Sequence, residues 1–431
     1  MKILLVNPPN CGRSIPEERY GIDSIRQIFR GEPLALEVLA GNLAGHEVRI
    51  LDLKAEPDGL QLAVEAFRPE LAAFTAVTCE AKTVLRLAGE LKESCGARIV
   101  VGGIHASSDP DFFNQPGVDY VAVGLGKGSF AELIAALEAG TPTGAIPGVA
   151  ATNPGVRLDF APRSFGPLDL AEQVHPRYDL VSGNRDSYIL SAVGARLGMV
   201  VSAFGCPYSC SFCCIGALTG GRYLTHSIET VIRDIRLLGD IPVIRLVDAN
   251  SFGNIGHARL LAQAIIAAGI RKHFIADVRS DTVVRHPSLM RLWREAGLRS
   301  VVIGFEEIAD GDLASFNKEN SVAVNDEAIA ILHDLGITIV GDFIVSPDYD
   351  EARFDALESY VNRRAIELPI LTVLTPLPGT PLHAEMRERI TLHDLDYYTL
   401  TNAVVATRLG EKRFYQRYAE MITSFHLNAK L

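Results

Sequence analysis

Short aliphatic runs alternate with amphipathic stretches through the first 140 residues of the chain. The runs are KILLVN, VRILDL, LAAFTAV, ARIVVGG and YVAVG. Continuous apolar runs indicate strands buried on both faces, and the stretches between them have helical spacing. The pattern predicts a doubly wound, Rossmann-like α/β domain over residues 1–140, with a ligand at the carboxyl ends of the strands. The loops that begin at Asn7, Thr78, Gly102 and Gly124 are therefore candidate binding loops.

A second alternating series follows residue 195. Its apolar runs are MVVSAFG, VIRLVDA, FIADVRSD, SVVIGFEE, TIVGDFIV and LTVLTPL, with helical patterns between them. Six such strands predict an incomplete parallel barrel, a partial (β/α)6 form of the eight-stranded barrel, over residues 196–380. Residues 141–195 are rich in Pro, Gly and Thr and are expected to be a linker. Residues 381–431 are less regular, and we expect a C-terminal cap over the barrel.

The amino-acid composition indicates which classes of binding partner and which cellular location to expect. The 431 residues carry a formal net charge of −11 without basic blocks, which favours a small-molecule substrate over nucleic acid. No apolar run approaches the roughly 20 residues that a membrane span needs. The seven cysteines are an odd number, and four of them lie within nine positions. With no export signal recognisable at the start, this usage predicts a reducing, cytoplasmic location and no disulfide framework.

The segment GCPYSCSFCCIG at residues 205–216 is the strongest chemical signal. Cys206, Cys210 and Cys213 have the spacing C-x3-C-x2-C within one loop. Three thiolates at this spacing can hold three irons of a cubane iron–sulfur cluster and leave the fourth iron open for chemistry. A structural zinc site, a redox pair of Cys210 and Cys213, and simple core packing are less favoured alternatives. Cys214 lies outside the spacing and is expected to pack against the protein.

The stretch CPYSCSFC, with Gly205, Pro207 and Phe212 around it, resembles the signature of radical S-adenosylmethionine (SAM) enzymes. The resemblance implies a [4Fe-4S] cluster whose open iron chelates SAM and cleaves it to a 5'-deoxyadenosyl radical. It also implies an external electron donor such as flavodoxin or ferredoxin. The resemblance spans nearly the whole chain, because TPLPGTPLH near residue 375 matches the end of this barrel in the same subgroup.

The resemblance also assigns SAM contacts at successive strand ends. Phe212 is the aromatic residue expected near adenine, and Asp248 and Asn250 in VDAN are expected at the methionine amino group. Arg279 and Glu306 occupy positions that contact the SAM carboxylate or ribose. Ala249 replaces a more usual acidic residue, which departs from the family pattern and weakens the assignment of Asp248.

A doubly wound domain placed before such a barrel resembles the cobalamin-binding module of cobalamin-dependent radical SAM enzymes. The matching positions are Asn7, Pro8 and Pro9 after the first strand, Gly102, Gly103 and His105 after the fourth, and Gly124 after the fifth. Glycines at strand ends permit the close approach that a corrin and its nucleotide tail require. The stretch GLGKGSF places Lys127 where the subgroup has acidic residues.

The expected lower face of the cobalt lies near Thr78, Cys79 and Glu80. The stretch LDLKAEPDG, where many cobalamin domains supply a histidine ligand, contains no histidine. His105 lies in a different loop, and a lone histidine is more often a hydrogen-bonding residue than a ligand. We therefore expect cobalamin with its own base detached and no histidine on the cobalt, and Cys79 is left open as a ligand.

The combined motifs predict C-methylation of a small-molecule biosynthetic intermediate. In this hypothesis a methyl group passes from SAM through methylcobalamin to an unactivated carbon. Radical cyclisation, ring contraction or another rearrangement without methyl transfer is the alternative, and a non-catalytic cobalamin sensor or carrier is a third. The stretch LTNAVVATRLGEKRFYQRYAEM resembles the tails of members that act on hopanoid-type lipids and tetrapyrroles, which favours an apolar or amphiphilic substrate.

Overall fold

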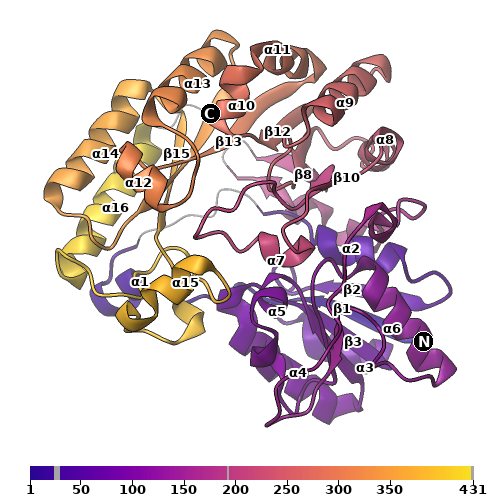
Figure 1. Ribbon diagram of the computed structural model, residues 1–431. Helices are drawn as coiled ribbons and strands as arrows, with labels where there is room; N and C mark the ends of the chain where they lie inside the picture. Colours follow the sequence, from indigo (N-terminus) through magenta and orange to yellow (C-terminus); the bar gives the residue numbers. More distant parts are fainter. Residues whose placement is uncertain (24–29, 192–193, 429–431) are drawn as a thin grey trace.

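The computed structural model describes residues 1–23, 30–191 and 194–428, and its first sheet builds the N-terminal domain (Figure 1). The strand order is β2-β1-β3-β4-β5-β6, and only β6 is antiparallel to its neighbour. The strands are β1 (Lys2–Asn7), β2 (Glu47–Asp52), β3 (Leu71–Thr75), β4 (Arg98–Gly102), β5 (Tyr120–Ala122) and β6 (Val149–Ala151). The order reverses between β1 and β3, which places a ligand crevice at their carboxyl ends.

Helices cover both faces of this sheet. Leu4 and Val6 of β1 share a buried cluster with α3 (Gly59–Phe67) and α4 (Ala81–Cys95). Ile3 and Leu5, which alternate with them, share another cluster with α2 (Leu34–Gly41) and α6 (Lys127–Ala139). Because successive strand residues point to opposite faces, the unbroken apolar run of β1 serves both layers. The prediction of a doubly wound domain is confirmed.

The second sheet is the partial barrel. Its order is β15-β14-β13-β12-β11-β8-β7, with six parallel strands and the short antiparallel β7 (Ile189–Leu190) at one edge. The parallel strands are β8 (Ala195–Val200), β11 (Val243–Leu246), β12 (His273–Asp277), β13 (Leu298–Glu306), β14 (Thr338–Val345) and β15 (Leu368–Val373). A separate pair, β9 (Ala203–Phe204) and β10 (Leu224–Thr225), flanks the cysteine loop. The six-stranded barrel prediction is confirmed.

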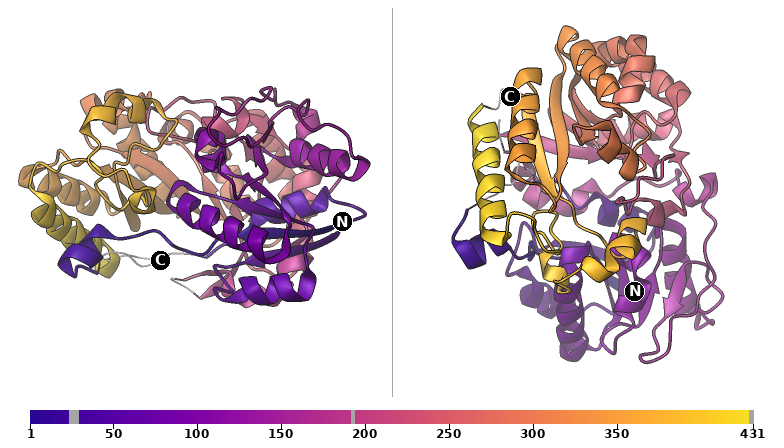
Figure 2. Two further views of the ribbon diagram at one scale, coloured as in Figure 1. Left: turned by 90° about the horizontal axis from the view of Figure 1, so that it is seen from below. Right: turned by 60° about the vertical axis from the view of Figure 1, so that its left-hand side comes forward.

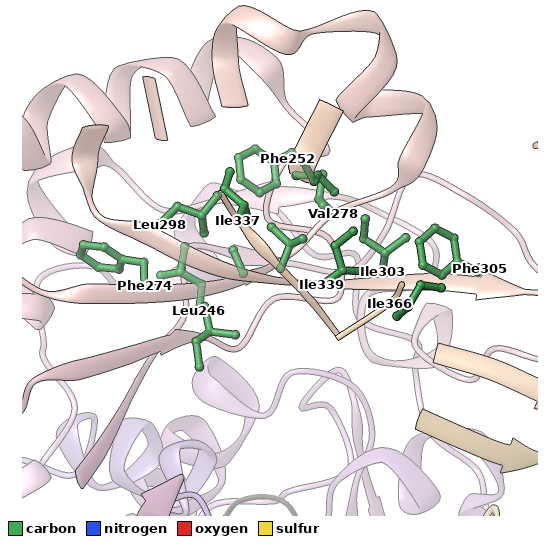
Figure 3. Close-up of a cluster of buried hydrophobic side chains, with 14 of the residues drawn as sticks. Leu246, Phe252, Phe274, Val278, Leu298, Ile303, Phe305, Ile337, Ile339 and Ile366 are labelled. Carbon is green, nitrogen blue, oxygen red and sulfur yellow. The ribbon is translucent and has the colours of Figure 1, made fainter. Parts of the chain in front are cut away.

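The core of the barrel lies between its sheet and the outer helices (Figure 3). These helices are α8 (Ile228–Leu237), α9 (Ile255–Ala267), α10 (Ser280–Arg285), α11 (Pro287–Ala296), α12 (Asp310–Ser315), α13 (Val322–Asp334) and α14 (Glu351–Arg364). On β13, Val301, Ile303 and Phe305 are fully buried toward the helices. The alternating Val302 and Gly304 are only half-buried, so they line the concave face.

The expected linker contributes one strand to each sheet, and the expected cap packs against the second sheet. β6 lies within residues 141–195 and extends the first sheet, and β7 from the same segment extends the second. Within the cap, α16 (Glu411–Asn428) packs on β15, where the Tyr418 hydroxyl donates to the Leu371 carbonyl at 2.8 Å. The N-terminal α1 (Ile15–Tyr20) lies beside α16 (Figure 2) and joins it through an Arg19–Glu411 ion pair at 2.9 Å.

In the described part of the chain, no helix combines the length and the apolar character needed to cross a membrane.

Candidate cluster, SAM and cobalamin sites

The cysteine loop leaves β9 through Gly205 and ends at α7 (Gly216–Thr219). Gly205 has a φ of +76°, and a Cβ atom there would lie 2.0 Å from the carbonyl oxygen of Arg222. Only glycine fits this turn, which directs the chain from the barrel strand into the loop. The sequence GCPYSC therefore folds locally into a loop at the carboxyl end of the first barrel strand, where barrel active sites are built.

The three thiols of the loop lie within electrostatic reach of one another. Burial raises the pKa of Cys210, and the neighbouring Lys318 and Arg279 charges oppose that shift. Burial also raises the pKa of Cys213 to about 11, with a further contribution from the thiols of Cys214, Cys210 and Cys206. Cys213 as a residue is nevertheless exposed to solvent. This concentrated set of soft donors fits a cluster that neutralises them as thiolates.

Among the described residues, no three His, Cys, Asp or Glu side chains are grouped to hold one metal ion. A cubane cluster takes each thiolate on a different iron, which sets its ligands farther apart than the ligands of one ion.

Asp248 and Asn250 follow β11 and differ in how they are used. The buried Asp248 carboxylate accepts hydrogen bonds from the backbone nitrogen and hydroxyl of Ser202, both at 2.7 Å, and from the Ala203 nitrogen at 2.9 Å. It thereby fixes the turn that leads into the cysteine loop. Asn250 is also buried, and its Nδ2 has no hydrogen-bond partner among the described residues. A buried donor without a partner is costly unless a ligand completes it.

Arg279 and Glu306 are buried beside the loop and engaged with protein groups. The Arg279 guanidinium donates to Asp281 at 2.9 Å and to the Lys318 carbonyl at 2.7 Å. Glu306 forms an ion pair with Lys318 at 2.7 Å and has a φ of +64°. A left-handed conformation in a residue other than glycine is strained and typical of functional sites.

A cavity of about 330 Å³ lies at the carboxyl edge of the first sheet. Gly102, Gly103 and Gly124 line it, and the barrel contributes Val201, Phe204, Leu218 and Val247. A Cβ at Gly124 would lie 2.2 Å from the Phe165 ring, and one at Gly103 would lie 2.7 Å from the Thr75 hydroxyl. Side chains at these glycines would crowd the crevice. The apolar, glycine-lined space therefore fits the nucleotide tail of a corrin.

The other residues predicted for the first domain lie outside this cavity lining. Asn7 is buried and donates to Asp52 at 2.7 Å, and the neighbouring Pro8 is also buried. Thr78 and Cys79 lie in a short turn after β3, where the Cys79 carbonyl accepts a hydrogen bond from the Cys11 thiol at 3.7 Å. His105 is fully buried, with its ring edge-on to Phe112 and Phe113, and burial lowers its pKa to about 4. Of the residues predicted to bind cobalamin, Gly102, Gly103 and Gly124 therefore line the cavity.

Lys127 has a structural explanation. Its buried ammonium donates to the Leu170 carbonyl at 2.5 Å and lies 5.5 Å from the centre of the Phe204 ring. The lysine in GLGKGSF thus joins the first domain to the 160–170 segment and to the barrel.

Sequence reasoning missed three residues near these sites. Tyr208 stacks under Arg279, Lys318 pairs with Glu306, and Asp342 projects from β14 on the same side of the sheet as Gly304. Burial raises the pKa of Asp342 to about 8, with Glu306 and Asp277 contributing. The available signal was a single carboxylate inside the otherwise apolar run TIVGDFIV.

Comparison with known proteins assigns the class. The B12 binding domain family matches residues 29–134, and the Radical SAM superfamily matches residues 200–361. The hopanoid C-3 methylase of Methylococcus capsulatus is 30% identical over 396 residues, which cover 90% of this chain and 75% of that protein. The chain therefore belongs to the cobalamin-dependent radical SAM enzymes. The predicted cofactors, a [4Fe-4S] cluster, SAM and cobalamin, and the predicted class of radical SAM methyltransferase are confirmed.

Two further relatives extend the comparison. The anaerobic magnesium-protoporphyrin IX monomethyl ester cyclase of Cereibacter sphaeroides is 27% identical over 384 residues, covering 82% of this chain and 61% of that protein. The methyltransferase TsrM of Kitasatospora setae, solved with cobalamin and a [4Fe-4S] cluster bound, superposes with a TM-score of 0.75 at 17% identity. That likeness covers 100% of this chain and 92% of TsrM, and it confirms the fold of both domains.

Proposed function

We propose that this enzyme transfers a methyl group from SAM, by way of cobalamin, to an unactivated carbon of a polycyclic, apolar small molecule. One observation carries the proposal. The carboxyl edge of the first sheet and the start of the barrel line a single cavity, in which Phe204 precedes the cysteine loop and Leu218 follows it. A corrin tail held there lies next to the cluster loop. The relatedness to a hopanoid methylase supports the apolar substrate class.

Each cofactor has a distinct role, and the chain positions them. When bound, the cluster supplies the electron that cleaves SAM, and cobalamin supplies the methyl group. Cys206, Cys210 and Cys213 hold the cluster, and the glycine-lined cavity holds the corrin tail. The Asn250 amide, buried and without a partner among the described residues, is suited to donate to the SAM carboxylate or ribose. The concave face of the barrel then receives the substrate.

The reductant is proposed to be an external protein such as flavodoxin or ferredoxin. Apart from the four cysteines of the loop, the chain has Cys11, Cys79 and Cys95. Cys11 lies beside Cys79 before α4, whereas Cys95 is the last residue of that 15-residue helix, so these three thiols are too far apart to hold a second cluster. Electrons must therefore arrive from outside the chain. A cytoplasmic location, proposed from the seven cysteines, supplies such donors.

The proposal is tested with the anaerobically reconstituted holoenzyme, SAM labelled with deuterium in its methyl group, and polycyclic triterpenoids as candidate substrates. We expect a product that carries the labelled methyl group, with S-adenosylhomocysteine and 5'-deoxyadenosine formed in equal amounts. A converted substrate without label would overturn methyl transfer.

A rearrangement without methyl transfer is the second candidate, and the relatedness to a tetrapyrrole ester cyclase favours it. Cyclisation consumes SAM only as the radical source. It therefore predicts 5'-deoxyadenosine without S-adenosylhomocysteine in the same experiment, with a magnesium-porphyrin ester as the substrate to compare.

A further inference from the structure

Residues 316–319, which we call the strap, hold the cysteine loop from about one hundred positions away. The Ser211 nitrogen donates to the Phe316 carbonyl at 3.0 Å. The Asn317 side-chain amide donates to the carbonyl and the hydroxyl of Ser209, both at 3.0 Å. The Phe316 ring packs edge-on against Phe212 with centroids 5.4 Å apart. Three successive parts of the loop are thus anchored to one short segment.

Arg279 connects the strap to a fourth part of the loop. Its Nη2 donates to the carbonyls of Lys318 at 2.7 Å and Glu319 at 3.1 Å. Its guanidinium lies 3.7 Å from the centre of the Tyr208 ring. Tyr208 stands between Cys206 and Cys210 in the sequence. A buried cation over an aromatic ring is a strong and directional contact. The Nε and Nη2 atoms of Arg279 thus bind Asp281 and the strap, while its guanidinium plane covers the Tyr208 ring.

The strap is also strained. Asn317 and Glu319 have φ values of +52° and +50°, and Glu306, which binds Lys318, has +64°. Left-handed residues other than glycine persist only where the surrounding contacts hold them, and they gather at functional sites. Asn317 is held by its bonds to Ser209 of the cysteine loop, Glu319 by Arg279, and Glu306 by Lys318.

We propose that the strap and Arg279 form a clamp that orders the cysteine loop before the cluster binds. Ordering a loop costs conformational entropy, and a clamp that has already ordered it leaves more of the binding free energy for capture of the cluster. Arg279 and Asn317 act as positioning residues in this proposal. The inference is independent of methyl transfer, because it concerns the loop and the cluster alone.

The test uses the full chain without its cluster, followed by anaerobic reconstitution. Asn317→Gly keeps the left-handed backbone and removes the amide donor, Arg279→Lys keeps the charge and removes the planar fork, and Tyr208→Leu removes the ring. The controls are Tyr208→Phe, which keeps the ring, and Glu319→Gly, which keeps the carbonyl acceptor. Hydrogen exchange of residues 206–214, bound iron and sulfide, and SAM affinity are measured for each.

We expect the three clamp variants to raise exchange at the Ser211 amide at least tenfold and to halve cluster content, with exchange in the first domain unchanged. The two controls should match the original protein. The clamp is overturned if Arg279→Lys leaves exchange and iron content unchanged and weakens only SAM binding, which would make Arg279 a SAM ligand. Unchanged exchange in all three variants would overturn it as well.

Discussion

The four cysteines between residues 206 and 214 differ in their expected roles, which single substitutions separate. Replacing Cys206, Cys210 or Cys213 with Ala removes one iron ligand from a set of three, so we expect each variant to lose the cluster and SAM cleavage. Cys214→Ala should retain the cluster. Iron and sulfide analysis with visible absorbance checks this. Full SAM cleavage by Cys210→Ala would contradict the ligand assignment.

Gly124 lies where the structure leaves no room for a side chain. Gly124→Ala combines a φ of +90° with a contact of 2.2 Å to Phe165, which must move into or away from the corrin cavity. We expect cobalamin affinity to fall at least tenfold, measured by spectroscopic titration.

Gly140→Ala is the matched control for Gly124→Ala. Gly140 has a φ of +64° with open space around it, so its substitution carries only the backbone strain of about 1 kcal/mol. It should leave cobalamin binding unchanged. Equal loss of binding in both variants would show that strain, and not the filled space, is responsible.

At the scale of elements, Lys127 joins the start of α6 to the 3-10 turn Pro167–Leu170. Burial lowers the pKa of this lysine to about 8 from its ordinary 10.5. Between these two pH values the unfolded chain holds one proton more than the folded chain, so stability rises with pH by up to about 3 kcal/mol. Lys127→Met should remove this rise in urea unfolding measured from about pH 8 to pH 10.5.

Lys412, which is exposed on α16, gives the control for Lys127. Lys412→Met should keep the increase in stability across the same pH range. If Lys127→Met keeps it too, another group is responsible for the pH dependence.

The parallel strands could be predicted from the sequence because they are mostly aliphatic runs, and their topology brings Gly102, Gly103 and Gly124 to one edge. The short β6 and β7 lie in the expected linker and were not predicted. Other features were not predictable in this way. His105 lies two residues after Gly103, but α5 (Ile104–Ser108) turns its ring into the core, and one polar residue does not reveal which face it takes. The contacts of Phe316 and Asn317 with the cysteine loop join positions too distant for any local pattern.

The C-terminal helix α16 shows a signal that was present and not recognised. Its buried residues Phe414, Tyr415, Tyr418, Met421 and Ile422 recur at helical spacing. Most of them are aromatic, which concealed the amphipathic pattern in a segment interpreted as irregular.

At the scale of the whole molecule, Glu32 joins the first domain to the barrel at a buried seam that also contains Glu37, Arg185 and Met199. Glu32 accepts from the Met199 nitrogen of the barrel at 2.5 Å and pairs with Arg185. Glu37 of the first domain is fully buried, and neither of its oxygens has a hydrogen-bond donor among the described residues. Burial, and then the charge of Glu32, raise the pKa of Glu37 well above its usual value.

This pair predicts opposite effects for two similar substitutions. The pKa of Glu37 is raised in the folded state, so the stability that its protonated carboxyl contributes is fully present below about pH 4.5. That stability is lost as the pH rises toward the pKa of Glu37 in the folded protein. Glu37→Gln keeps a neutral donor beside Glu32, so we expect higher stability at pH 7 and a flatter decline above pH 4.5. Glu32→Gln breaks a buried ion pair and should lose about 3 kcal/mol. Urea unfolding across this pH range measures both, and a less stable Glu37→Gln protein at pH 7 would show that the Glu37 carboxylate is ionised at the seam.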